Sequence, residues 1–196
     1  MSRSCTSNGF SFAEVAVVMS VVSVLGAAAA PTIGDYITES RIVRANSDVR
    51  VVANAMARMS AAVIAQGQRP GGLQTYDLLV SPGAAPAIAA GVSDVWSLAN
   101  GAGKVGLIDD QFITNRPGYA GRKNSLPAGV RGWGGPYLDR PLESDPWGHR
   151  YAIRLGQGRD VTLVLSAGPD GVVQTRDGEN GLEPAGDDII AVVEGR

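Results

Sequence analysis

Residues 10–31 read FSFAEVAVVMSVVSVLGAAAAP and are almost entirely apolar or small. A helix of this length spans about 30 Å at ~1.5 Å per residue, which is enough to cross the hydrocarbon core of a bilayer. One carboxylate, Glu14, lies near the start of the run, where an ionised side chain costs on the order of 2.5–3.5 kcal/mol. The stretch therefore predicts a membrane-spanning helix in which Glu14 needs a partner.

Two interpretations of this segment stay open on its residues alone. The segment is either a plain transmembrane anchor, with Glu14 reaching out to the interface, or a secretory signal peptide. As a signal peptide it would use Arg3 as its basic region and residues 28–30 as a small-residue cleavage site. Pro31 directly after that site disfavours cleavage there, although a site one residue earlier stays open.

The junction GFSFAE, residues 9–14, resembles the processing site of type IV prepilins. This resemblance implies that a prepilin peptidase removes a leader, residues 1–9, by cutting after Gly9, and that Phe10 is then N-methylated. It also implies a partner for Glu14, which is the free Phe10 amine of the neighbouring subunit in a filament. Each charge would then offset part of the burial cost of the other.

The following segment carries one apolar stripe at alternating spacings of three and four residues, which is typical of one helix face. The stripe consists of Ile42, Ala45, Val49, Val52, Met56, Met59 and Val63. Together the two segments predict one long helix over residues 10–65, inserted in the membrane to about residue 33. Pro31 and Gly34 are expected to weaken or bend it. A short coiled coil is one use for the stripe, but packing against the chain's own sheet is favoured.

Residues 66–196 are expected to form one globular head. Residues 151–155 alternate as a strand, residues 161–165 are expected to be the second strand of a hairpin, and residues 189–193 predict a third strand. The predicted fold is α+β, with the long N-terminal helix packed on a small C-terminal antiparallel sheet with long loops. Residues 67–131 are expected to be a loop-rich insertion, with helical structure at 76–80 and short helical turns at 93–98 and 107–112.

Two motifs in the head, Gly-Pro-Tyr-Leu at 135–138 and Asp-Pro-Trp-Gly at 145–148, followed by Tyr151, resemble the major pseudopilin of type II secretion systems. The resemblance covers residues 9–65 and 133–193 but not the middle stretch. It implies the lollipop arrangement of pilins, with a periplasmic head. Trp133 and Trp147 are expected to fix loops onto the sheet.

The segment 166–190, SAGPDGVVQTRDGENGLEPAGDDII, is rich in carboxylates and glycines. Such loops suit Ca²⁺, which takes about six to eight oxygen ligands. The resemblance implies that Asp170, Asp187 and Asp188 are calcium ligands and that backbone carbonyls, such as that of Ala167, complete the shell. A solvated acidic loop is the alternative. Cleavage after Gly9 would remove the only cysteine, so a metal would take the place of a disulfide.

Several function classes are disfavoured by composition and motifs. The net charge is −2 and there is no basic stripe, so no nucleic-acid partner is expected. The only histidine, His149, has no nucleophile motif beside it, so the chain is not expected to be an enzyme. The GAGKVG run at 101–106 lacks the preceding strand that a dinucleotide site requires.

The resemblance as a whole implies a structural subunit for type II protein secretion. It would be a single-pass inner-membrane protein with a periplasmic head, and it would assemble into a homopolymeric filament in the periplasm. Its expected partners are the prepilin peptidase, the minor pseudopilins and the inner-membrane assembly platform. The alternatives are a minor pilin or other type IV pilin-like subunit for adhesion or DNA uptake, and a secreted calcium-binding domain with a cleaved signal peptide.

Overall fold

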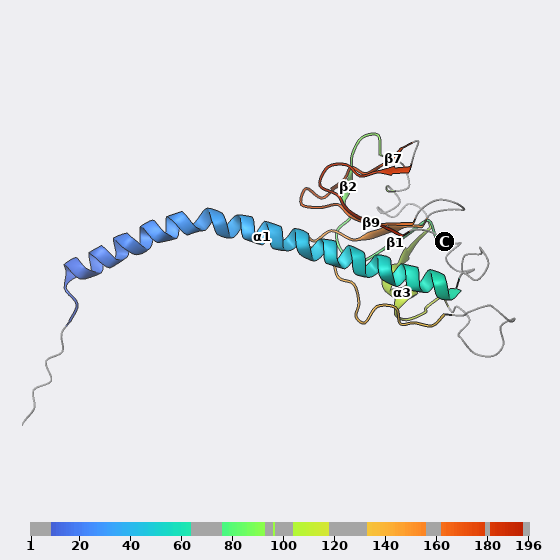
Figure 1. Ribbon diagram of the computed structural model, residues 1–196, viewed down its shortest axis with the longest axis horizontal. Helices are drawn as coiled ribbons and strands as arrows, with labels where there is room; N and C mark the ends of the chain where they lie inside the picture. Colours follow the sequence, from blue (N-terminus) through green and yellow to red (C-terminus); the bar gives the residue numbers. More distant parts are fainter. Residues whose placement is uncertain are drawn as a thin grey trace, which may run out of the picture. The chain divides into compact units, whose positions relative to one another are not determined.

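The computed structural model describes residues 9–63, 76–92, 96, 104–117, 133–155, 162–178 and 181–193. The chain divides into two compact units, Met1–Ser40 and Arg41–Arg196. Helix α1 (Phe12–Val63) is continuous and passes from the first unit into the second (Figure 1). Its backbone stays helical at Pro31 and Gly34, so the single long helix predicted from the sequence is confirmed.

The head is built on a five-stranded sheet in the order β3-β1-β4-β5-β9. Its strands, in chain order, are β1 (Leu78–Val80), β3 (Val105–Leu107), β4 (Ala152–Arg154), β5 (Thr162–Ser166) and β9 (Ile189–Val193). The β4–β5 hairpin and strand β9 confirm the three strands predicted from the sequence. The pairs β1–β4, β4–β5 and β5–β9 are antiparallel, but β1 pairs with β3 in parallel. The α+β prediction is therefore confirmed, while the sheet is mixed rather than purely antiparallel.

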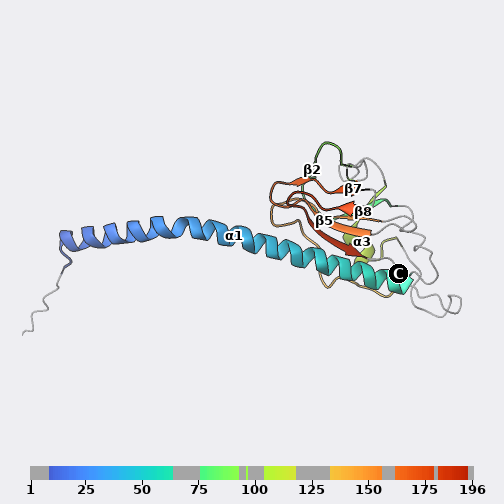
Figure 2. The same ribbon diagram turned by 45° about the horizontal axis from the view of Figure 1, so that its top comes forward.

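One face of this sheet is covered by the second half of α1, which lies across it in both views (Figures 1 and 2). The buried helix positions are Ala45, Val49, Val52, Met56 and Met59, as the apolar stripe predicted. They share one core cluster with Leu79, Ile153 and Val164 of the sheet. The stripe thus packs inside its own chain.

A partly buried hydrogen bond joins the same helix to Tyr151, the residue directly before β4. The Tyr151 hydroxyl donates to Asp48 Oδ2 at 3.0 Å. Burial, reinforced by repulsion from Asp48, raises the pKa of Tyr151 above its ordinary value. The hydroxyl therefore stays protonated and remains a donor.

The opposite face of the sheet is covered by the middle stretch of the chain. Leu78, Val80, Leu163 and Leu165 form a second cluster whose largest member is the fully buried Trp96. Partly buried side chains of the middle stretch, Ile88, Val92 and Val105, pack against this cluster. The insertion is thus part of the core.

The middle stretch also corrects one prediction and confirms another. Residues 76–80 were expected to be helical, and that was wrong, because residues 78–80 form the buried strand β1 between β3 and β4. The short helix expected at 107–112 is α3 (Ile108–Phe112). Of the turn expected at 93–98, only the helical Trp96 lies among the described residues.

Two small pairs of strands complete the head. β2 (Ala87–Ile88) pairs in parallel with β6 (Val172–Val173), and β7 (Arg176–Gly178) pairs with β8 (Gly181–Glu183) as a hairpin. Trp133 and Trp147 both pack on the first core cluster. Trp133 also donates from Nε1 to the Gln111 carbonyl at 3.1 Å, as expected of a residue that fixes a loop.

Candidate functional site

The acidic loop starts and ends at one place in the sheet. It leaves β5 after Ser166 and enters β9 at Ile189, and these two residues are register partners. The loop therefore begins and ends beside this register pair, with Ala167 on one side and Asp187 and Asp188 on the other. Antiparallel pairing thus brings together residues that are about twenty positions apart in the sequence.

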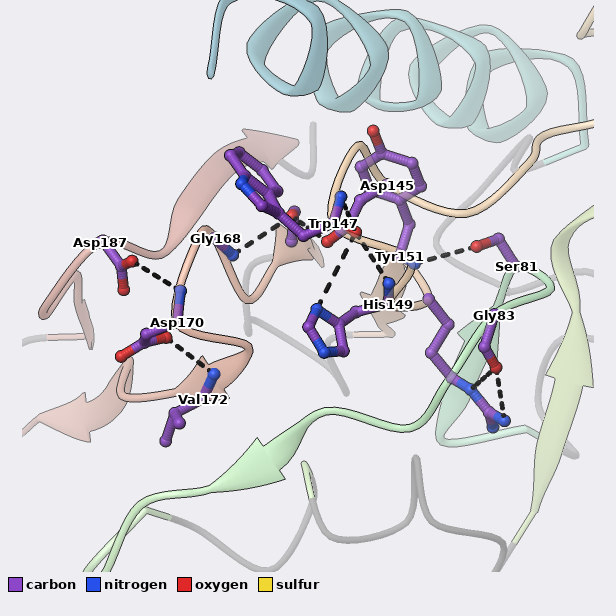
Figure 3. A network of polar contacts seen from close by, with 12 residues as sticks. Ser81, Gly83, Asp145, Trp147, His149, Tyr151, Gly168, Asp170, Val172 and Asp187 are labelled. Atoms are coloured by element: carbon purple, nitrogen blue, oxygen red, sulfur yellow. Dashed lines mark hydrogen bonds and ion pairs between the residues drawn. The ribbon is translucent and has the colours of Figure 1, made fainter. Parts of the chain in front are cut away.

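Asp187 lies against the first turn of the loop. Its Oδ2 accepts a hydrogen bond from the Asp170 N–H at 3.1 Å (Figure 3). Gly168 has φ 67°, and a side chain there would collide with the Asp187 carbonyl oxygen. Glycine at 168 therefore permits both the left-handed turn and the close approach of the two loop ends.

Asp188 is held by three donors through one carboxylate oxygen. Its Oδ2 accepts from the Gln174 N–H at 2.8 Å, and from the Thr175 N–H and hydroxyl, both at 2.6 Å. Burial raises the pKa of Asp188; the three hydrogen bonds oppose this, and repulsion from Asp187 adds to it. The charged form of Asp188 is therefore short of compensation in this loop.

Asp170 is the exposed member of the set. Its Oδ1 accepts from the Val172 N–H at 2.8 Å and its Oδ2 from Gln174 Nε2 at 2.9 Å. Its backbone and side chain thus connect Asp187 to Gln174. One continuous polar network therefore joins four residues, Asp170, Gln174, Asp187 and Asp188.

Three buried oxygens in this network have no hydrogen-bond donor among the described residues. They are Asp187 Oδ1, Asp188 Oδ1 and Gln174 Oε1. Gln174 Oε1 lies directly against the backbone of Gly186, the residue before Asp187. A buried acceptor without a donor is costly, and two of the three carry charge.

These orphaned acceptors fit a hard cation, because calcium is bound by oxygens alone. Within the described part of the chain, no three His, Cys, Asp or Glu side chains lie close enough together to hold an ion by themselves. An ion here would therefore be bound by carboxylate oxygens together with neutral oxygens. The Ala167 carbonyl, expected to be a ligand, is one such neutral oxygen. Ala167 itself is fully buried.

The Asp-Pro-Trp-Gly turn is connected to the base of the loop. The buried carboxylate of Asp145 accepts from the Trp147 and His149 N–H groups at 3.0 and 2.8 Å. Its other oxygen accepts from the Ser166 hydroxyl at 2.8 Å, and Ser166 Oγ accepts from the Gly168 N–H at 3.3 Å. The sequence analysis used this turn as a motif and gave a role only to Trp147, whereas Asp145 supports the start of the acidic loop.

The other candidate residues lie in the first unit. The Ser11 N–H donates to Glu14 Oε2 at 2.9 Å, and the Val15 N–H donates to the Ser11 carbonyl at 3.1 Å. Ser11 and Glu14 thus occupy the N-cap and N3 positions of a capping box, a role that the sequence analysis missed although the Ser-x-x-Glu spacing signals it. Phe10 and Phe12 are 87% and 90% exposed.

The apolar part of α1 has the properties of a membrane anchor. Among the described residues it is the one helix long and apolar enough to cross a bilayer, and its most apolar window has no burial within the chain. This statement rests on the length and composition of the helix. A signal sequence would have the same two properties.

The family model of type II secretion system (T2SS) protein G matches residues 122–183. The matched region contains the Asp-Pro-Trp-Gly turn, strands β4 to β8 and most of the acidic loop. No curated protein and no solved structure matches the chain. The match confirms the resemblance to the major pseudopilin, a structural and non-enzymatic family.

Proposed function

We propose that this chain, a pilin-like protein most similar to the major pseudopilin of type II secretion systems, is the repeating subunit of a periplasmic filament. The observation that carries the proposal is the combination of a protein G match in the head with an apolar helix that starts at a GFSFAE junction. The subunit does no covalent chemistry. It is cleaved after Gly9 and N-methylated at Phe10, and it remains in the inner membrane until assembly.

The exposed apolar surface of α1 indicates that this part of the helix is covered by something other than its own chain. Large apolar side chains near its start are 45–90% exposed: Phe12, Val15, Val17, Val18, Met19, Val21, Val22, Val24 and Leu25. Such a continuous apolar surface is not stable in water. Lipid would cover it in the membrane, and the helices of neighbouring subunits would cover it in the filament.

Glu14 would provide the register between subunits. In the filament its carboxylate would pair with the free amine of Phe10 from the next chain, at a depth where neither charge is stable alone. The prepilin peptidase, the minor pseudopilins and the inner-membrane assembly platform are the proposed partners of the processed subunit.

Calcium is proposed to order the head. Asp187 and Asp188 would hold the ion through their orphaned oxygens, with Asp170 and the Ala167 carbonyl contributing to the shell. The bound ion supplies positive charge that removes the repulsion between the carboxylates. The chain itself contributes the turn at Gly168, which permits the close approach of the two loop ends, and the Asp145 contact that supports the start of the loop.

An intact mass of the protein recovered from its native membrane tests the function. We expect a chain that begins at Phe10 and carries one additional methyl group. A chain beginning near residue 30 would instead indicate a secreted calcium-binding domain. An uncut chain would indicate a plain anchored protein, and either result would contradict the filament proposal.

A further inference from the structure

Residues 83–90, here called the strap, run along two other segments of the head. The first half lies beside the turn that follows Asp145: the Ala84 N–H donates to the Gly148 carbonyl at 2.9 Å, and the Arg150 N–H donates to the Ala84 carbonyl at 3.0 Å. The Gly83 carbonyl accepts from the Arg150 guanidinium at 3.1 and 3.3 Å. Figure 3 shows Gly83 beside this turn.

The second half of the strap is β2, which lies beside the acidic loop. The Ala87 N–H donates to the Gly171 carbonyl and the Ala89 N–H donates to the Val173 carbonyl, both at 2.9 Å. Between these two bonds, Ile88 packs against the second core cluster. The strap is therefore anchored by the core and by the turn, independently of any ion.

The strap bonds to the part of the loop from which the acidic residues receive their hydrogen bonds. Val172, between the two strap bonds, donates its N–H to Asp170. Gln174 and Thr175, directly after the second bond, donate their N–H groups to Asp188. The conformation of residues 171–175 thus determines where both carboxylates point.

We propose that the strap is a positioning element that holds the acidic loop in its ion-binding conformation before calcium arrives, and so raises calcium affinity. This inference rests on the calcium site proposed above. Ordering a loop on binding subtracts from affinity, and a loop ordered in advance avoids that loss. The strap comes from the middle stretch, outside the region that matches protein G.

Two proline variants separate the loss of one strap hydrogen bond from the general effects of introducing a proline. Ala89→Pro removes the N–H that donates to Val173. Ala90→Pro is the matched control, because Ala90 is the second residue of a turn closed by the Val92 N–H on the Ala89 carbonyl at 3.2 Å. Gly91 follows with φ 82°, as in a type II turn, in which proline is favoured at the second position.

Calcium titration of the full chain in detergent micelles gives the first readout. We expect the Kd of Ala89→Pro to rise about tenfold, the equivalent of ~1.4 kcal/mol and the size of one hydrogen bond. Ala90→Pro should bind like the wild type. Calcium uptake with equal Kd in the wild type and Ala89→Pro would overturn the strap inference alone, whereas no uptake by the wild type would overturn the calcium site itself.

Amide hydrogen exchange in the presence of chelator gives a readout that needs no ion. The Gln174 and Thr175 amides should be protected in the wild type and in Ala90→Pro, and should exchange faster in Ala89→Pro. Unchanged protection of β5 amides would show that the head is still folded. If Ala89→Pro unfolds the head, Ile88→Ala loosens the strap more gently and should speed exchange at the same two amides. Unchanged exchange in the variant that folds would overturn the inference.

Discussion

Glu14 has two separable properties at the scale of the residue, its shape as a hydrogen-bond acceptor and its charge. The acceptor is used inside the chain, where Glu14 Oε2 receives the Ser11 N–H. Glutamine serves equally well at this position of a capping box, whereas alanine does not. The charge has no use within that contact and is available for an amine from another chain.

We therefore expect Glu14→Gln to keep the hydrogen bond from the Ser11 N–H and Glu14→Ala to lose it. The two variants should not differ in their ability to form filaments. Both variants should insert into the membrane, since each removes a costly charge. Both should form few filaments, because neither pairs with the amine of Phe10. Membrane fractionation followed by cross-linking of assembled filaments measures both steps, and normal filaments from Glu14→Gln would refute the charge pairing.

The residues of the acidic loop were predictable only in part. The motif placed Asp170, Asp187 and Asp188 in one loop, and the register of β5 and β9 explains why the loop ends meet. Gln174 and Thr175 had no signal in the sequence. Both hold Asp188 through backbone N–H groups, which every residue but proline carries, and no motif marks the additional bond from the Thr175 hydroxyl. Their role follows from tertiary contacts alone.

At the scale of elements, long periodic segments were predictable and short buried ones were not. The stripe on α1 repeats over about six turns, and alternation at 151–155 marks β4. Strand β1 has only three residues, all buried, and periodicity cannot distinguish such a run from a helix turn. Its strand character comes from pairing with β4, more than seventy residues later in the chain.

The middle stretch is expected to contribute to the stability of the folded head. Trp96 is fully buried in the cluster on the second face of the sheet. Trp96→Ala should therefore lower the free energy of unfolding by about 3–5 kcal/mol, the usual cost of deleting a large core aromatic. Chemical denaturation followed by circular dichroism measures this.

Leu107→Ala is the control for that experiment. Leu107 belongs to β3 of the same stretch but is 47% exposed, so the loss should be far smaller. Equal losses in the two variants would mean that Trp96 does not anchor the middle stretch to the sheet.

At the scale of the whole molecule, the head depends on its loop ends staying together. After cleavage following Gly9 the chain would have no cysteine, so no disulfide would assist the two core clusters. An ion that binds only the folded head stabilises it by an amount that grows with the logarithm of the ion concentration. The protein as a whole should therefore melt at a temperature that depends on calcium.

We expect chelator to lower the melting temperature of the wild type and to have little effect on Asp187→Ala. At a free calcium concentration about a hundredfold above Kd, the difference corresponds to ~2.7 kcal/mol. Asp139→Ala makes the same charge change at an exposed residue outside the loop and should respond to chelator like the wild type. Identical melting of the wild type with and without chelator would remove the calcium proposal.

The β7–β8 hairpin offers a practical consequence for microscopy. Its two strands pair with each other, while the Ser166–Ile189 rung closes the loop at its base. Chain length added at the tip of such a hairpin costs little, because loop entropy grows slowly with length. An epitope or small fluorescent label inserted between Gly178 and Gly181 would therefore leave Asp170, Asp187 and the sheet in register. In a filament of this chain, such a label would mark each subunit once.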